Sequence, residues 1–459
     1  MINSTDTIAA ISTAMNNSGI GIVRISGADA IKILNKIFRP AKEKDMESVP
    51  GNTIHYGHIV DGDSIVDEVL VSVLRAPHTY TREDTAEINC HGGMFVLNRT
   101  LELVCRSGAR PAEPGEFTKR AFLNGRIDLS QAEAVIDVIN AENNYALKSA
   151  VSQLGGSISE KIKKERAILL EQMAYIEAAL DDPEHIEMEG YAETLLPLLE
   201  KSRDSVDALI ATADDGRIIK EGIKTVILGK PNVGKSSLLN ALLGTDRAIV
   251  TDIAGTTRDA LEESLRVNDI NLNVIDTAGI RETEDVIEKI GVEKAKEYAK
   301  DADLIVFVLD ASRPIDEDDR EIARIISGRK AIALLNKTDL PAQTKKEEAE
   351  KLAGCTVIET QVRNGEGMEA FAAEIKRMFY KGDIDFNDQV YITNVRQKNA
   401  LISARESIAK AIGSVKDGMP EDFYTIDMMD AYMFLGQVIG EAIEDDLANE
   451  IFDRFCMGK

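Results

Sequence analysis

The chain has 459 residues, enough for about two to four domains with sizeable cores. Its formal net charge of −25 counts against a large basic groove for nucleic acid on this chain alone, so an RNA substrate would need positive surface from a partner. The four cysteines, Cys90, Cys105, Cys355 and Cys456, lie far apart, which argues against zinc sites and disulfides and favours a reducing compartment. No targeting segment or long apolar run is evident, so we expect a cytoplasmic protein without membrane contact.

Residues 1–118 mix strand-like runs with helical patterns. The segments 21–25 and 65–73 are rich in Val and Ile, as strands are. The segments 30–38 and 94–106 carry apolar residues at helical spacing. This mixture predicts a small α+β domain.

The pattern is helical from 119 to 215 and again from 381 to 459. The run Ser130-Gln131-Ala132-Glu133 resembles a capping box ahead of an apolar-periodic segment. A long helical pattern then extends to Leu180, Pro183 marks a break, and a second pattern begins near Ala192. These stretches predict a helical domain.

Residues 216–380 alternate strands and helices, which predicts a doubly wound, mostly parallel sheet. The predicted strands are 223–229, 261–268, 271–276, 303–309, 330–335 and 355–359. The simplest architecture inserts this α/β domain into the helical domain, which is then discontinuous (119–215 and 381–459). Such insertion is tolerated because the ends of a domain often lie close together.

The run 229–236, GKPNVGKS, joins the first of these strands to an apolar helical segment with the spacing of a P-loop. Its glycines let backbone N–H groups approach a polyphosphate. Lys235 can reach the β- and γ-phosphates, and Ser236 can offer its hydroxyl to Mg²⁺. The loop predicts a nucleotide site.

Three further motifs follow the P-loop in the order of a GTPase. Asp276 begins the run DTAG, where it can hold Mg²⁺ through water while Gly279 senses a γ-phosphate. The run NKTD ends in Asp339, whose carboxylate can accept both N–H donors of guanine. Between the P-loop and DTAG, the run GTTRD at 255–259 is a candidate switch segment whose Thr257 hydroxyl could complete the Mg²⁺ shell. The predicted GTP contacts are Asn232, Val233, Gly234, Lys235, Ser236, Ser237, Thr251, Asp252, Ile253, Ala254, Gly255, Thr256, Thr257, Asp276, Thr277, Ala278, Gly279, Asn336, Lys337 and Asp339.

This set of motifs resembles the translation-factor class of GTPases, with one departure. Ile280 follows DTAG where Ras-like proteins carry the Gln that positions the attacking water. Either hydrolysis is slow or another polar group orients the water. The nearby carboxylates are Glu282, Glu284, Asp285 and Glu288.

Several further runs make the chain resemble the MnmE (TrmE) family, the GTPases of wobble-uridine modification in bacterial tRNA. These runs are GIVRISG at 21–27, EINCHGG at 87–93, RPAEPGEFT at 110–118, RAFLNGRIDL at 120–129 and the ending FCMGK at 455–459. The resemblance implies an N-terminal domain that dimerises and binds a 5-formyl-tetrahydrofolate-type donor, and a helical domain interrupted by a Ras-like GTPase domain. It places the folate contacts on Arg24, Glu87, Arg126 and Lys459.

The resemblance also implies a potassium-stimulated mechanism with transient pairing of two GTPase domains. It places the K⁺ ligands on Asn232, Thr251, Ile253 and Thr256, and the water-positioning carboxylate on Glu288. A monovalent cation beside the phosphates could do the electrostatic work of an arginine finger.

The family's C-terminal Cys corresponds to Cys456, for which a nucleophilic and a positioning role are both open. The resemblance further implies a flavoprotein partner, MnmG (GidA), that binds FAD and NADH and assembles with this chain into a heterotetramer or larger complex on tRNA. The product class is a 5-aminomethyl or 5-carboxymethylaminomethyl uridine.

Two other readings stay open from the residues. A regulatory switch in ribosome assembly could use the same GTPase domain, but it would be expected to carry a basic RNA-binding domain. A small-molecule folate enzyme with a regulatory GTPase domain would turn over without tRNA.

Overall fold

A computed structural model describes residues 6–186, 188–244, 263–267, 270–275, 297–380 and 390–441, together with Phe452, Phe455 and Gly458. The chain divides into two compact units. The first comprises Met1–Ile139, Gln153–Arg203 and Ala400–Lys459, and the second comprises Asn140–Ser152 and Asp204–Asn399. The predicted domain boundaries at 118, 215 and 380 stay predictions.

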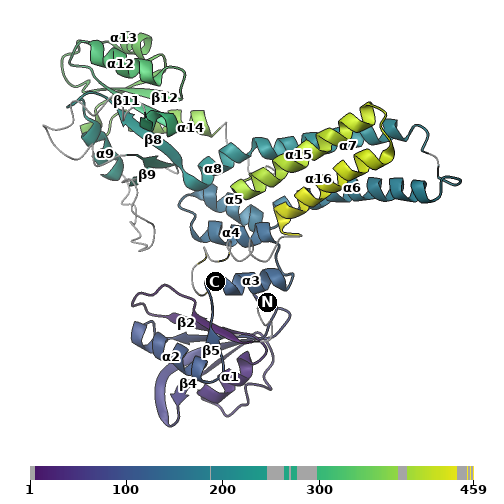
Figure 1. Ribbon diagram of the computed structural model, residues 1–459. Helices are drawn as coiled ribbons and strands as arrows, with labels where there is room; N and C mark the ends of the chain where they lie inside the picture. Colours follow the sequence, from purple (N-terminus) through teal and green to yellow (C-terminus); the bar gives the residue numbers. More distant parts are fainter. Residues whose placement is uncertain are drawn as a thin grey trace. The chain divides into compact units, whose positions relative to one another are not determined.

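The first unit contains a seven-stranded sheet with strand order β3-β4-β5-β6-β2-β1-β7. Neighbouring strands are antiparallel except for β1 and β7. The helices α1 and α2 cover one face, where Val69, Val71 and Val73 of β5 point inward and are buried. The predicted α+β domain is confirmed (Figure 1). The elements are β1 Ile8–Ile11, β2 Gly21–Ser26, α1 Ala30–Ile37, β3 Phe38–Pro40, β4 Thr53–Asp61, β5 Ser64–Leu74, β6 Thr85–Cys90, α2 Met94–Arg106 and β7 Arg110–Pro111.

The helical part of the chain is confirmed as helical, with bounds that differ from the sequence pattern. The long pattern before Leu180 is three helices, because the backbone turns between them and Gly156 adopts a φ of 94°. These helices are α4 Leu129–Ile139, α5 Asn144–Leu154 and α6 Ser157–Asp181; they follow α3 Glu116–Leu123 and precede α7 Tyr191–Ala211 and α8 Ala213–Glu221. The chain returns as α15 Val395–Lys416 and α16 Glu421–Ile439.

The capping box predicted at Ser130 is wrong by two residues. Asp128 accepts a hydrogen bond from the Gln131 N–H at 3.1 Å, and its own N–H donates to Gln131 Oε1 at 3.0 Å. Asp128 is therefore the capping residue, and Ser130 lies inside α4 with its hydroxyl donating to Asp128.

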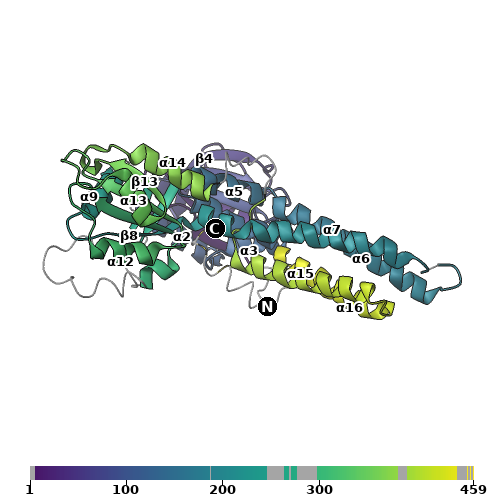
Figure 2. The same ribbon diagram turned by 90° about the horizontal axis from the view of Figure 1, so that it is seen from above.

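Segments distant in the sequence run side by side in the first unit. There α6 packs along α16 (Figures 1 and 2). The Arg166 guanidinium of α6 lies 4.0 Å from the ring centre of Tyr432 of α16. Phe452 and Phe455 pack with Leu129 and Ala121 in a separate small core. The carboxyl-terminal residues that the structure describes thus belong to this unit.

The second unit contains a six-stranded sheet in the order β13-β12-β11-β8-β10-β9, parallel except for the β9–β10 pair. Both faces are covered: α9 and α14 pack on one, α12 and α13 on the other. All seven residues of β11 are therefore buried, as strands between two helical layers are. This confirms the predicted doubly wound sheet. Its elements are β8 Ile223–Leu228, α9 Lys235–Gly244, β9 Glu263–Val267, β10 Ile270–Val274, β11 Leu304–Asp310, α12 Glu317–Ile326, β12 Ala331–Asn336, α13 Lys346–Ala353, β13 Thr356–Thr360 and α14 Met368–Phe379.

Across the described ranges, every helix is too short or too polar to cross a membrane.

Candidate functional site

The P-loop connects β8 to α9 through backbone conformations that need small side chains. Gly234 has a φ of 110°, and a Cβ there would lie 2.2 Å from Nδ2 of Asn336. Gly229 has a φ of 155°, and a Cβ there would lie 2.6 Å from the carbonyl oxygen of Val308. Asn232, at φ 62°, is a residue type that tolerates the left-handed region. The glycine pattern therefore follows from close packing as well as from phosphate approach.

The Lys235 ammonium points back into this loop. It donates to the carbonyl oxygens of Gly229 at 2.6 Å and Lys230 at 2.8 Å. Burial lowers the pKa of Lys235 to about 8. A polyphosphate would supply the negative charge that these neutral carbonyls do not, so the arrangement suits a nucleotide phosphate.

The NKTD motif is joined directly to the P-loop. Asn336 is buried, donates from Nδ2 to the Val233 carbonyl at 2.9 Å, and accepts at Oδ1 from the Val362 N–H at 3.2 Å. Lys337 donates to the Asn232 carbonyl and to Asp310 Oδ2, each at 2.6 Å. These contacts hold the two motifs at one edge of the sheet, where the parallel strands β8 and β12 end.

Asp310 is the buried anchor of this arrangement. Burial by itself would raise the pKa of the Asp310 carboxyl. The hydrogen bonds from Lys337 and Ser312 outweigh this effect and hold the pKa below its usual value. Asp339, by contrast, is exposed, and its carboxylate has no partner among the described residues. A ligand with two adjacent N–H donors could therefore approach it from solvent.

The structure thus brings together the predicted residues of the P-loop and of NKTD. Ser236 and Ser237 lie in the first turn of α9, with Ser236 exposed, and Val233 is buried beneath the loop. The remaining predicted residues lie outside the described residues: Thr251, Asp252, Ile253, Ala254, Gly255, Thr256, Thr257, Asp276, Thr277, Ala278, Gly279, Glu288, Cys456 and Lys459.

A second cluster lies in the first unit, on the sheet and at the start of the helical segments. Arg24 of β2 and Glu87 of β6 are register partners, and Arg24 Nε donates to Glu87 Oε1 at 2.8 Å. Arg24 also donates from Nη1 to the Gly458 carbonyl at 3.5 Å. The Arg126 guanidinium lies 4.7 Å from the ring centre of Tyr80, which Arg24 also approaches at 5.6 Å. The three predicted folate contacts that are described therefore converge.

Tyr80 and Phe117 are members of this cluster that sequence reasoning missed. Arg24 lies 5.5 Å from the Phe117 ring, and the Tyr80 hydroxyl pairs with the Thr118 hydroxyl at 2.9 Å. Phe117 and Thr118 belong to the GEFT run, and this motif could have indicated that they lie at the site. The sequence around Tyr80 contains no such motif. Guanidinium groups, a carboxylate and aromatic rings in one place fit a flat, donor-rich heterocycle with an acidic tail.

Comparison with known proteins places the chain in a family. The family model described as the MnmE helical domain matches residues 129–456, and the GTP-binding protein TrmE N-terminus matches residues 7–126. The tRNA modification GTPase MnmE of Lachnoclostridium phytofermentans is 54% identical over 456 residues, covering 99% of this chain and 100% of that protein. The MnmE proteins of Thermoanaerobacter pseudethanolicus and Acetivibrio thermocellus are each 50% identical, with 99% of both chains covered. The chain belongs to the MnmE family of tRNA modification GTPases.

Proposed function

We propose that this chain hydrolyses GTP and uses the resulting conformational change to modify C5 of the wobble uridine in certain tRNAs. The observation that carries the proposal is the direct joining of the P-loop to NKTD by Asn336 and Lys337. That joining sets a phosphate-binding lysine and a guanine-binding carboxylate on one rigid sheet edge. We place this activity in the cytoplasm.

In this proposal Lys235 binds the β- and γ-phosphates, and the N–H groups of the P-loop and the first turn of α9 surround them. Ser236 and Thr257 would hold Mg²⁺, which neutralises charge that develops on the phosphates. Glu288 orients the attacking water in place of the missing Gln. The observed carbonyl partners of Lys235 keep its ammonium beside the loop before the phosphates arrive.

The decisive experiment is mass analysis of wobble nucleosides from cells that lack this chain. Complementation with the wild type is expected to restore 5-aminomethyl or 5-carboxymethylaminomethyl uridine, whereas Lys235→Ala is not. Normal wobble nucleosides in the deletion would rule the proposal out. Loss of ribosomal subunits with unchanged nucleosides would favour the ribosome-assembly switch.

The affinity for GDP should fall as pH rises through about 8. The Lys235 pKa of about 8 in the free site should rise when a phosphate adds negative charge, so binding takes up a proton above this pH. Below it the lysine is already protonated and affinity should be flat; above it the affinity should fall by up to about tenfold per pH unit. Calorimetry in buffers of different ionisation enthalpy measures the proton uptake. In Lys235→Arg, which stays charged, the uptake should vanish; its persistence would assign the effect to another group.

We further propose that Asn232, with Thr251, Ile253 and Thr256, binds K⁺ beside the phosphates when two GTPase domains pair. Asn232 is exposed on the P-loop, and its main-chain carbonyl is held by Lys337, which leaves the side chain available. The cation would offset charge on the leaving phosphate in the paired state.

Hydrolysis is expected to be at least about tenfold faster in KCl than in NaCl, as befits one electrostatic partner of the transition state. Asn232→Gly should lose this preference, because glycine keeps the positive φ of 62° and removes only the side chain. Asn240→Gly, at an exposed position of α9, serves as the control. Equal rates of the wild type in the two salts would remove the K⁺ proposal.

The second cluster is proposed to bind a 5-formyl-tetrahydrofolate-type donor. Glu87 would accept from the pterin N–H groups, and Arg24, Arg126 and Lys459 would pair with the glutamyl carboxylates. Tyr80 supports this assignment, since its ring already holds both arginines near one place.

Arg24→Ala is expected to weaken binding of 5-formyl-tetrahydrofolate by about tenfold or more, because a charge-assisted contact is lost. Fluorescence titration or calorimetry measures the dissociation constant. Arg39→Ala, which removes an exposed arginine of the same sheet, should bind as the wild type does. If the two variants behaved alike, the folate would have to bind elsewhere.

Dimerisation through the N-terminal domain is supported by an apolar patch on the sheet face opposite α1 and α2. Ile54 and Tyr56 of β4 and Leu70 of β5 are 69%, 49% and 49% exposed.

A flavoprotein partner, MnmG (GidA) carrying FAD, would supply the redox chemistry and the basic surface that this acidic chain lacks. Together they would form a heterotetramer or larger complex on tRNA.

Cys456 is proposed to act close to the one-carbon donor, as a nucleophile or a positioning group. The supporting observation is that Gly458, two residues further along the chain, accepts from Arg24. Gly458 also fits tightly: a Cβ there would lie 2.2 Å from the Ile11 carbonyl oxygen. Complementation with Cys456→Ser tests the role through the same nucleoside analysis.

A further inference from the structure

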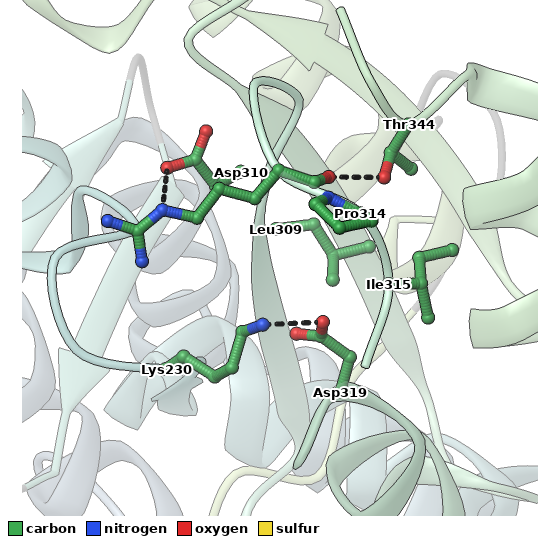
Figure 3. A pocket seen from close by; sticks show the side chains of 8 residues that line it. Lys230, Leu309, Asp310, Pro314, Ile315, Asp319 and Thr344 are labelled. Atoms are coloured by element: carbon green, nitrogen blue, oxygen red, sulfur yellow. Dashed lines mark hydrogen bonds and ion pairs between the residues drawn. The ribbon is translucent and has the colours of Figure 1, made fainter. Parts of the chain in front are cut away.

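Lys230, the second residue of the P-loop, is held by a pair of carboxylates from outside the loop. Its ammonium donates to Asp316 Oδ2 at 2.6 Å and lies 2.7 Å from Asp319 Oδ2 (Figure 3 shows the Asp319 pair). The Lys230 side chain is 12% exposed and that of Asp319 is 4% exposed. Burial by itself would lower the pKa of Lys230. The contacts with Asp316 and Asp319 outweigh this effect and hold the pKa above its usual value.

Hydrogen bonds within α12 orient both carboxylates independently of the lysine, because the two residues form the capping box of this helix. Asp316 Oδ1 accepts from the Asp319 N–H at 3.3 Å, and Asp319 Oδ2 accepts from the Asp316 N–H at 3.1 Å. The helix start therefore presents two pre-oriented oxygens to the P-loop at little further cost in side-chain entropy.

The contact between Lys230 and Asp319 is largely buried and lies beside apolar side chains. Leu309, Pro314 and Ile315 line the small pocket beside it (Figure 3). Asp319 Oδ1 is buried and has no hydrogen-bond partner in the described structure. Lys230 thus supplies the cation beside a carboxylate with little access to water, so its loss would be costly.

The same segment braces the P-loop a second time. Asp310, at the end of β11, binds Lys337, which donates to the Asn232 carbonyl. Residues 310–319 therefore reach the loop at two points, at Lys230 directly and at the Asn232 carbonyl through Lys337. The carbonyl of Lys230, at the first of these points, accepts a hydrogen bond from the Lys235 ammonium.

We propose that Lys230 is a positioning residue of the nucleotide site, held by the α12 capping carboxylates so that its carbonyl fixes the ammonium of Lys235. This inference rests on the proposed nucleotide site at Lys235. Without the brace, the loop would have to be ordered at the moment of binding, and part of the binding free energy would be lost.

The test compares GDP dissociation constants of folded variants well below their unfolding temperatures. Lys230→Met is expected to weaken GDP binding by about tenfold, equivalent to about 1.4 kcal/mol. Lys230→Arg, which can still reach both carboxylates, should rescue the affinity to within about threefold. Lys398→Met, which removes a half-buried lysine paired with Asp214 in the same unit, is the matched control and should not change the affinity. A merely structural role would lower the melting temperature and leave the affinity of the folded protein unchanged.

Asp319→Asn should also weaken GDP binding. The double variant with Lys230→Met should bind GDP no more weakly than the weaker-binding single variant, because both substitutions remove the same Lys230–Asp319 contact. Unaltered affinity in folded Lys230→Met would overturn the proposal. If that variant does not fold, Asp316→Asn decides: a raised dissociation constant supports the brace, and an unchanged one overturns it. If Lys235→Ala binds GDP normally, the nucleotide site itself is wrong; if only Lys235→Ala loses GDP, the site stands and the brace fails.

Discussion

Replacing Lys235 with alanine is expected to weaken GTP binding by at least about 100-fold and to abolish measurable hydrolysis. A partly buried ammonium contacting two phosphates makes charge-assisted hydrogen bonds, each of which contributes about 1.5–3 kcal/mol. The observed partners of Lys235 are neutral carbonyls, so alanine leaves no buried carboxylate unpaired among the described residues and the fold should survive. Equilibrium binding of a fluorescent guanine nucleotide and phosphate release measure the two effects.

The control for this variant is Lys346→Ala, which removes an equal charge from an exposed position at the start of α13. It should bind and hydrolyse GTP as the wild type does. Similar loss in both variants would mean that general electrostatic attraction, not the P-loop, governs binding in so acidic a chain.

Asp339→Asn is expected to change the preferred base of the bound nucleotide from guanine to xanthine. A carboxylate accepts from both the N1–H and the 2-amino group of guanine, whereas an amide places one donor against a donor. Because a site built to hydrogen-bond its ligand strongly rejects an analogue that leaves a polar group unpaired, GDP affinity should fall by about 100-fold or more. Xanthine presents a carbonyl at that position, so xanthosine diphosphate should bind the variant better than GDP.

Competition between the two diphosphates measures this preference directly. Asp339 is exposed and has no partner among the described residues, so its replacement should not disturb the folded structure. Asp301→Asn, at another exposed position of the same unit, should keep the guanine preference. A variant at Asp339 that still preferred GDP would place guanine recognition on other residues.

The GTPase sheet could be read from the sequence almost residue by residue. The strand predicted at 303–309 is Leu304–Asp310, and that predicted at 330–335 is Ala331–Asn336. Strands covered by helices on both faces are short apolar runs between turns, and such runs are a local signal. The P-loop and NKTD were equally legible, because each concentrates its chemistry in a few adjacent residues.

The starts of helices were harder to predict from the sequence, because several polar residues near a helix start can each act as its capping residue. Ser130 and Asp128 both precede an apolar run at suitable spacing, and Gln131 selects Asp128 by closing the second bond of the box. The breaks within the long helical pattern were missed for a related reason: apolar periodicity continues across the turns that separate α4, α5 and α6.

The fold class, the order of the elements and the motifs of a guanine-nucleotide site could all be inferred from the amino-acid sequence alone. The side chains that support those motifs became known only from the folded structure. Tyr80 contacts both Arg24 and Arg126, and Lys230 pairs with Asp316, 86 positions further along the chain. Such partners carry no local pattern, because hydrophobic periodicity and turn chemistry act over a few residues, while packing brings together surfaces from distant elements.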